Sequence, residues 1–349
     1  MRSDGVCLCP KFLHSASGFA ESGYGRIAGG DVYFSHAEVI DRATGTRRLE
    51  SYASLKASAE TLIQKALERI EAPRVPILEF DLAEPVIMGI INVTPDSFSD
   101  GGVHGTTETA ISQGRTLAAE GARILDVGGE STRPGSDPVD IETELSRVLP
   151  VIEGLRGEEV VISCDTRKSP VMSAALGSGA SIINDVSSLN HDRKSRSVAA
   201  KAGAPVILMH SKGEPKVMQD APSYEDVGLE VFDTLEADLR LCEEAGISRS
   251  RIIVDPGIGF GKTFDHNLEL LHNLALFHGL GVPVMLGVSR KGFLGALTGV
   301  REAGRRAVGS VSAALIGLDA GVQFFRVHDV RQTVEAFAVW RGVARRRVG

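Results

Sequence analysis

From residue 85 onward the chain repeats one unit, a short apolar run rich in β-branched residues followed by a stretch of helical periodicity. The apolar runs lie at 86–91, 123–127, 160–164, 181–183, 205–209, 251–254, 283–288 and 323–327. Strands that are apolar along their whole length and separated by helices are typical of a parallel sheet covered by helices. Eight such units over about 260 residues match a (β/α)8 barrel, which typically takes about 250. We therefore predict an α/β fold, a TIM barrel over residues 85–349.

A doubly wound open sheet is the competing architecture. The number of units argues against it, and so does the lack of a Gly-x-Gly-x-x-Gly turn after the first strand. A later glycine-rich segment, 257–263, resembles a triphosphate-binding loop that ends in Lys262 and Thr263. That motif requires a glycine where this chain has Pro256, so we do not predict a nucleotide triphosphate site there.

Residues 1–84 lack this regularity and form an N-terminal extension. Val32, Phe34 and His36 alternate with polar residues ahead of a turn at 44–45, which predicts a short hairpin. Apolar residues at helical spacing over 55–70 predict a helix. Residues 1–30 carry many Gly and Ser without a clear period, so we expect them to be loosely ordered. Nothing in the extension suggests chemistry, and it serves either as a cap on the barrel or as an interaction element.

Composition excludes several classes of protein. Of the 349 residues, 43% are hydrophobic and 24% charged, which is typical of globular domains. The net charge of -7 argues against a nucleic-acid partner. No stretch approaches the roughly 18 uninterrupted apolar residues of a membrane span, and the N-terminus does not resemble a secretory signal. Four cysteines in a chain of this length do not indicate a disulfide framework. We expect a cytoplasmic protein.

Polar residues follow every predicted strand. In chain order they are Asn92, Asp126, Asp165, Asn184, Asp185, His210, Asp255, Ser289, Arg290, Lys291, Arg326 and His328. In a barrel all these strand ends open onto one face, where the active sites of this fold lie. Any one of them alone is readily explained as a cap of a strand-to-helix turn. Their occurrence after all eight strands predicts a catalytic bowl.

The residue types in this bowl constrain its ligand. Arg326 and His328 lie two apart on one strand and so point to the same side. With Lys291, and with Arg133 in a glycine-rich loop, they suit a phosphate or diphosphate. Asp165, at the end of another apolar strand, and Asp255 are expected across from them. Buried carboxylates there need donors, which a flat nitrogen heterocycle with an amidine-like edge supplies. The combination suggests transfer chemistry.

Long motifs at all eight strand ends resemble the dihydropteroate synthase family over about residues 85–345. They are MGIINVTPDSFSDGG (88–102), LDVGGESTRPGS (125–136), SCDTRK (163–168), IINDVSSL (182–189), LMHSKGEP (208–215), VDPGIGFGK (254–262), LGVSRKGFLG (286–295) and RVHDV (326–330). The resemblance implies condensation of para-aminobenzoate with 6-hydroxymethyl-7,8-dihydropterin diphosphate, which yields 7,8-dihydropteroate and diphosphate in folate biosynthesis. It also implies a homodimer.

Site roles are implied residue by residue. Asn92 matches the family's Mg²⁺-associated asparagine, Arg326 and His328 its diphosphate anchors, and Thr132 and Arg133 its mobile loop. Around the pterin the resemblance places Asp165, Asn184, Asp255 and Lys291, with Met209 and Phe260 as apolar walls. Ser289, Phe98 and Pro134 match positions near para-aminobenzoate, and Asp96 lies on the first loop. The catalytic set that we predict is Asp165, Lys291, Arg133, Arg326 and His328.

The implied mechanism needs no covalent intermediate, which suits a site without an obvious nucleophile–base pair. Neutralisation of the diphosphate favours its departure, and a nearby carboxylate such as Asp165 stabilises the resulting cationic methylene. Two alternatives stay open. A corrinoid-type, pterin-dependent methyltransferase barrel would not need Thr132, Arg133, Lys291 or the Arg326–His328 pair, so their joint presence argues against it. An inactive pterin-binding paralogue would be supported by the loss of an anchor, and none is lost.

Overall fold

The computed structural model describes residues 5–15, 23–94, 102–131, 136–213, 218 and 221–345, and residues 102–106 by their backbone only. Its main sheet has eight parallel strands in the order β10-β9-β8-β7-β6-β5-β12-β11. These are β5 (Val86–Asn92), β6 (Ile124–Gly128), β7 (Val161–Asp165), β8 (Ile182–Asp185), β9 (Val206–Met209), β10 (Ile252–Asp255), β11 (Met285–Leu286) and β12 (Phe324–Val327). A parallel bridge between Val254 and Val284 joins the two ends of this order. The predicted (β/α)8 barrel is therefore confirmed.

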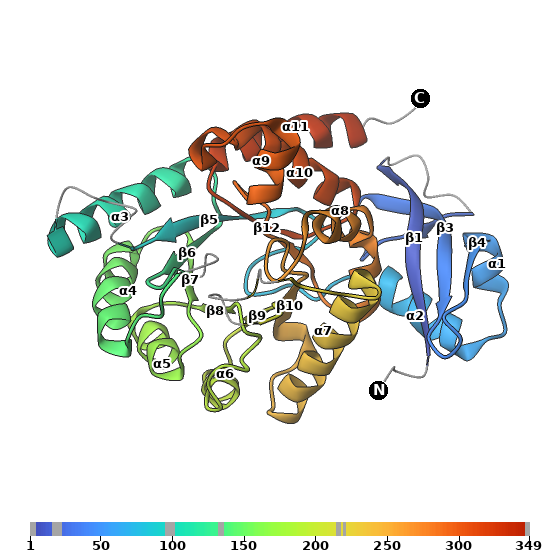
Figure 1. Ribbon diagram of the computed structural model, residues 1–349, viewed down its shortest axis with the longest axis horizontal. Helices are drawn as coiled ribbons and strands as arrows, with labels where there is room; N and C mark the ends of the chain where they lie inside the picture. Colours follow the sequence, from blue (N-terminus) through green and yellow to red (C-terminus); the bar gives the residue numbers. More distant parts are fainter. Residues whose placement is uncertain are drawn as a thin grey trace.

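Helices surround the barrel, as Figure 1 shows. They are α3 (Gly102–Ala119), α4 (Ile141–Leu155), α5 (Ser169–Ser178), α6 (Ser195–Ala202), α7 (Val227–Glu244), α8 (Phe264–His272), α9 (Gly292–Thr298), α10 (Ala307–Asp319) and α11 (Val330–Ala344), with a 3-10 segment η4 (Leu274–Leu280) after α8. One predicted strand is shorter than expected. Only Met285–Leu286 of the apolar run 283–288 forms β11. Pro283 has no N–H to donate to a neighbouring strand, and its carbonyl accepts from Val254 N at 3.0 Å.

The inside of the barrel is apolar at one end and polar at the other. A buried cluster fills the apolar end with one residue from most strands and with three residues that precede β5. Its members are Val86, Met88, Ile124, Ile182, Ile207, Ile253, Met285, Phe324, Ile77, Phe80 and Leu82. Because side chains two apart on a strand point the same way, Ile124, Ile182, Ile253 and Phe324 are each followed inside the barrel by a polar residue. This alternation places Asp126, Asn184, Asp255 and Arg326 in one layer above the apolar cluster.

The extension folds into a small sheet with two helices. Its elements are β1 (Val6–Ser15), β2 (Gly25–Arg26), β3 (Val32–Asp41), β4 (Arg47–Ser51), α1 (Tyr52–Ala57) and α2 (Thr61–Glu71). β3 and β4 form the expected hairpin, and the helix expected over 55–70 is broken into two at Ser58. The expectation that residues 1–30 are loosely ordered is wrong for 6–15, which pair along β3 for the whole length of β1. This strand packs against η4, a partner that the local sequence does not reveal.

Contacts of several kinds join the extension to the side of the barrel, and β1 and α2 are its elements on that side in Figure 1. Lys11 Nζ donates to Asn273 Oδ1 at 2.7 Å, and Arg74 Nη2 donates to the carbonyl of His278 at 3.0 Å. Ala275 of η4 belongs to the same buried cluster as the extension's own apolar residues. The extension therefore packs against the side of the barrel through both polar and apolar contacts.

Candidate active site

A cavity of about 890 Å³ lies at the polar end of the barrel. Its lining includes each described residue to which the family resemblance gave a role, namely Asn92, Asp165, Asn184, Met209, Asp255, Phe260, Ser289, Lys291, Arg326 and His328. Asp126, Asp185 and His210, also predicted at the strand ends, are not among the lining residues. The other assigned residues, Thr132, Arg133, Pro134, Phe98 and Asp96, lie outside the described residues. A cavity of this size suits a small molecule of the dimensions of a substituted heterocycle.

Arg326 occupies the centre of a buried charge cluster. Its Nε donates to Asp126 Oδ2 at 2.6 Å, and its Nη2 donates to Asp165 Oδ2 at 2.8 Å. Asn184 Nδ2 donates to the same Asp126 oxygen at 3.0 Å. The expectation that cationic and acidic groups face each other across the cavity is therefore wrong for Arg326, which contacts two carboxylates directly. The guanidinium is held rigidly beside the residues assigned to the heterocycle.

Asp126 is a site residue that the sequence analysis named at a strand end but gave no role. It is fully buried, and its Oδ2 accepts from both Arg326 and Asn184. The sequence signal for Asp126 is its position two residues after Ile124, because the side chain of Ile124 points into the barrel. Asp126 thus holds both Arg326, a predicted diphosphate anchor, and Asn184, a predicted pterin-binding residue.

Burial raises the pKa of Asp165 to about 7, although the Arg326 guanidinium opposes the shift. The carboxylates of Asp126 and Asp185 raise this pKa further. Asp165 therefore changes its charge close to neutral pH, in a cavity where a positive charge on a ligand is stabilised by its ionised form.

Asp255 and Lys291 form a second pair of groups in the cavity. Asp255 Oδ1 accepts from Gly257 N at 2.7 Å, and burial raises the pKa of this carboxyl while Lys291 opposes the shift. Burial also lowers the pKa of Lys291 to about 8, against the attraction of Asp255. The Lys291 ammonium donates to the carbonyl of Ile258 and lies 4.4 Å from the centre of the Phe260 ring. The pair presents an acceptor and a donor beside an aromatic wall.

Lys262 joins the chain segments that follow β9 and β10, and the sequence analysis considered it only within a motif that does not match. Its Nζ lies 2.9 Å from His210 Nδ1 and donates to the carbonyl of Phe260 at 3.0 Å. Burial lowers the pKa of His210, so the ring is neutral. At Gly257, φ is +67°, and a Cβ there would lie 1.8 Å from the His210 carbonyl oxygen. Only glycine permits this close approach.

His328 and Ser289 meet at another part of the rim. The Ser289 hydroxyl lies 3.0 Å from His328 Nδ1 and accepts from the backbone N–H of His328 at 3.1 Å. Next to them, Arg290 makes two bonds to Asp329, at 2.6 and 3.1 Å, so its charge is already paired. The Ser289 hydroxyl therefore orients the imidazole of His328 toward a ligand in the cavity.

Comparison with known proteins agrees with this geometry. Residues 88–328 match the family model described as pterin binding enzyme. The dihydropteroate synthase of Escherichia coli (strain K12) is 46% identical over 260 residues, which cover 74% of this chain and 92% of that protein.

Two solved structures of the Xanthomonas albilineans dihydropteroate synthase are also similar. The complex with 4-aminobenzoic acid has a TM-score of 0.72 and 47% identity, and covers 76% of this chain and 94% of that one. The complex with 7,8-dihydropteroate has a TM-score of 0.69 and 44% identity, with coverage of 76% and 95%. The extension up to residue 84 precedes the part that matches the family. With its barrel, its cavity and these relatives, the chain belongs to the pterin-binding enzymes and, among them, to the dihydropteroate synthase family.

Proposed function

We infer that this chain is itself a dihydropteroate synthase, a transferase of folate synthesis. It condenses para-aminobenzoate with 6-hydroxymethyl-7,8-dihydropterin diphosphate and releases 7,8-dihydropteroate and diphosphate. The observation that carries this inference is the single cavity that holds Asp165, Asn184 and Asp255 together with Arg326 and His328. Acceptors for a nitrogen heterocycle and donors for an anionic leaving group are thereby within reach of one substrate. The relatives solved with 4-aminobenzoic acid and with 7,8-dihydropteroate support the same reaction.

We propose that the pterin ring lies between the wall formed by Met209 and Phe260 and the buried polar layer. The Asp255 carboxylate accepts from the amidine-like edge of the ring, since a buried carboxylate with one oxygen already bonded to Gly257 still has capacity to accept. Asn184 and Lys291 bond other ring atoms. Such groups on separate, rigid strands select a flat heterocycle by its pattern of donors and acceptors.

We propose that Arg326 and His328 neutralise charge on the departing diphosphate, and that Asp165 stabilises the cationic methylene that its departure leaves. Arg326 is suited to this role because Asp126 and Asp165 fix its guanidinium before substrate binds. The aromatic amine of para-aminobenzoate, near Ser289, then forms the new C–N bond and loses a proton. We keep Thr132 and Arg133 as proposed participants in binding the diphosphate.

The residues present fit a Mg²⁺ ion that enters with the diphosphate. Asn92, at the end of β5, presents an amide in the same cavity as the proposed anion anchors. Within the described part of the chain no group of three His, Cys, Asp or Glu is arranged to hold a metal by itself. Sparse protein ligands are typical of Mg²⁺ bound mainly by substrate phosphates and water. When bound, the ion neutralises part of the diphosphate charge.

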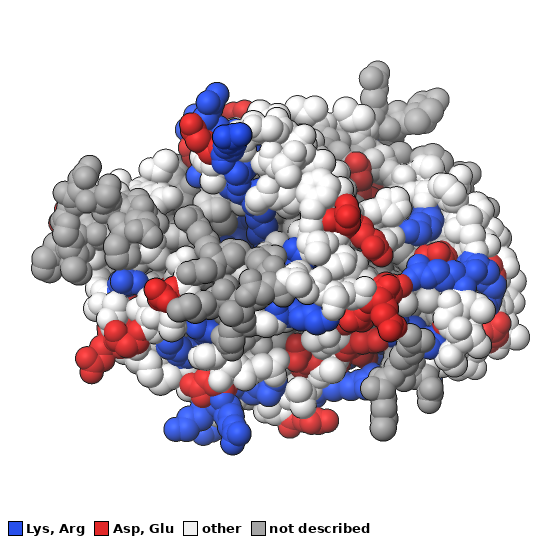
Figure 2. Space-filling model, in the orientation of Figure 1, with Lys and Arg blue, Asp and Glu red and all other residues white. Residues whose placement is uncertain are grey.

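We also propose a cytoplasmic homodimer, as the resemblance implies. All four cysteines are free thiols, which is typical of a reducing compartment. Among the described residues no helix is long and apolar enough to cross a membrane. On the face shown in Figure 2, Lys and Arg side chains are interspersed with Asp and Glu rather than gathered in one broad area. That distribution favours small-molecule substrates over nucleic acid.

Diphosphate release by the purified protein tests the proposed function. The assay contains the dihydropterin diphosphate and Mg²⁺, with and without para-aminobenzoate. We expect release that depends on the aromatic amine and is matched by an equal amount of dihydropteroate. Binding of the pterin without turnover would support the inactive paralogue instead. If Asp255→Ala left pterin binding unchanged, the assignment of the cavity would be wrong.

A further inference from the structure

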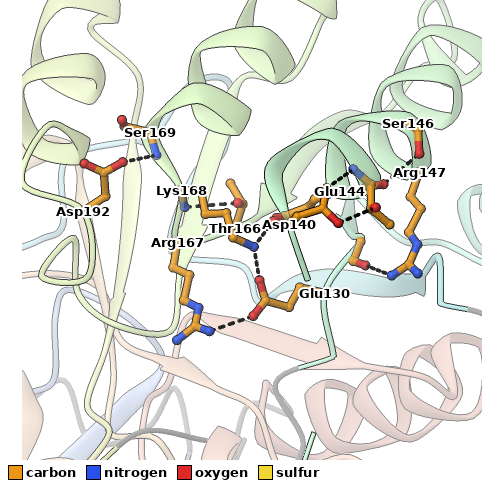
Figure 3. A network of polar contacts seen from close by, with 12 residues as sticks. Glu130, Asp140, Glu144, Ser146, Arg147, Thr166, Arg167, Lys168, Ser169 and Asp192 are labelled. Carbon is orange, nitrogen blue, oxygen red and sulfur yellow. Dashed lines mark hydrogen bonds and ion pairs between the residues drawn. The ribbon is translucent and has the colours of Figure 1, made fainter. Parts of the chain in front are cut away.

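Four buried charged side chains form a network beside the cavity, and none of them has a role in the proposed reaction so far. Arg167 Nη2 donates to Glu130 Oε1 at 2.7 Å, and Lys168 Nζ contacts the carboxylates of both Glu130 and Glu144. The exposed fraction of these side chains is between 0% and 12%. Figure 3 shows Lys168 between the two glutamates, with Arg167 reaching Glu130 from another direction.

The network joins three elements of the barrel. Glu130 follows β6, Arg167 and Lys168 follow β7, and Glu144 lies in the first turn of α4. Two positive and two negative charges balance within it. Ion pairs removed from water contribute little net stability, because desolvation offsets their attraction, but their strict geometry can specify one arrangement of the chain. The network is therefore better explained by the chain geometry that it fixes than by a contribution to the free energy of folding.

The network positions the segment that follows β6, residues 129–131. Gly129 packs so closely on α4 that a Cβ there would lie 2.8 Å from a methyl group of Val148. Its carbonyl accepts from Arg147 Nη1 at 2.8 Å. The next residue, Glu130, is held by the network, and Ser131 after it lines the cavity. Gly129 and Glu130 are thus both held from outside the cavity, directly before Ser131 reaches its lining.

We propose that Glu130 is a positioning residue for the transfer step: held by Arg167 and Lys168, it sets where Ser131 meets the substrate. This inference rests on the proposed function. The groups proposed to bind the pterin, such as Asp165, Asn184 and Asp255, lie on β7, β8 and β10 and keep their own contacts. Loss of the Glu130 charge should therefore affect turnover more than pterin affinity.

The test compares Glu130→Gln with a matched control, Glu158→Gln. Glu158 accepts from Arg115 at 2.8 Å in an exposed ion pair between α3 and the end of α4, remote from the cavity lining. We measure kcat, the KM for each substrate, direct binding of the dihydropterin diphosphate, and the thermal midpoint. Misplacement of a reacting group by about 1 Å is enough to lower a rate about 100-fold. We expect Glu130→Gln to lower kcat at least about tenfold per folded molecule and to change pterin affinity less than about twofold.

A second variant keeps the test decisive if Glu130→Gln folds poorly. Arg147→Met removes the donor to the Gly129 carbonyl and leaves all four buried charges paired. We expect a smaller fall in kcat, with pterin affinity again unchanged. An unchanged kcat in the folded fraction of both variants, or equal losses of turnover and pterin affinity, would overturn the inference. An inactive wild type and Glu158→Gln would instead overturn the proposed function and the inference with it.

Discussion

Asp126→Asn gives the sharpest test of the buried cluster around Arg326. In the wild type, Asp126 Oδ2 lies 2.6 Å from Arg326 Nε, and Asp165 binds the same guanidinium. The substitution keeps the size and one carbonyl-type acceptor but removes the charge. A hydrogen bond to a charged group contributes about 1.5–3 kcal/mol, which corresponds to a loss of about 10- to 150-fold in kcat/KM for the pterin substrate at pH 8.

The same substitution should extend the activity to lower pH, even though it lowers the maximal kcat/KM. The charge of Asp126 raises the pKa of Asp165, which is about 7 in the wild type. Without that charge the pKa of Asp165 falls, because one of the negative charges that oppose its ionisation is gone. Because ionised Asp165 is the active form in our proposal, activity should persist to lower pH in the variant.

The assay is the initial rate of para-aminobenzoate-dependent diphosphate release from pH 5 to 9, with subsaturating pterin substrate. Circular dichroism at each pH confirms that both proteins are folded. We expect a lower plateau together with an acidic limb that is displaced downward in pH. An acidic limb that stays in place, or moves upward, would refute the assignment of that limb to Asp165.

Three further outcomes follow from the geometry. The pKa of Lys291, lowered by burial to about 8, predicts that kcat/KM for the pterin falls as pH rises through about 8; Lys291→Arg should move this basic limb to higher pH in the same assay, and an unmoved limb would exclude Lys291 as its source. Arg74→Met leaves the carbonyls of Arg69, Ala72 and His278 without their donor. Urea denaturation should therefore give a free energy of unfolding lower by about 2–4 kcal/mol. An unchanged midpoint would contradict a structural role for the extension. Gly257→Ala forces the backbone away from His210, and calorimetry should find pterin binding at least about tenfold weaker; binding at the wild-type affinity would show that this close approach does not shape the pocket.

The barrel was predictable because each strand carries its own signal. Apolar runs in the sequence mark the strands, and polar residues directly after them mark one rim. Such signals are local, so a single sequence is enough to read them.

Other features depend on partners far away in the chain, and the local sequence does not predict them. β1 becomes ordered because it pairs with β3 and packs against η4, some 260 residues later. Lys262 meets His210 only because two loops cross at Gly257. The contact of Arg326 with Asp126 and Asp165 depends on side-chain length and direction inside the barrel, which spacing along the chain does not specify.

The central claim is that this cavity binds the pterin within the buried polar layer of the barrel. A crystal structure of the protein with 7,8-dihydropteroate bound tests it most directly. We expect the pterin ring between Phe260 and Arg326, with its amidine-like edge within hydrogen-bond distance of Asp255. A pterin bound outside this cavity, or one whose ring makes no contact with Asp255, would contradict it.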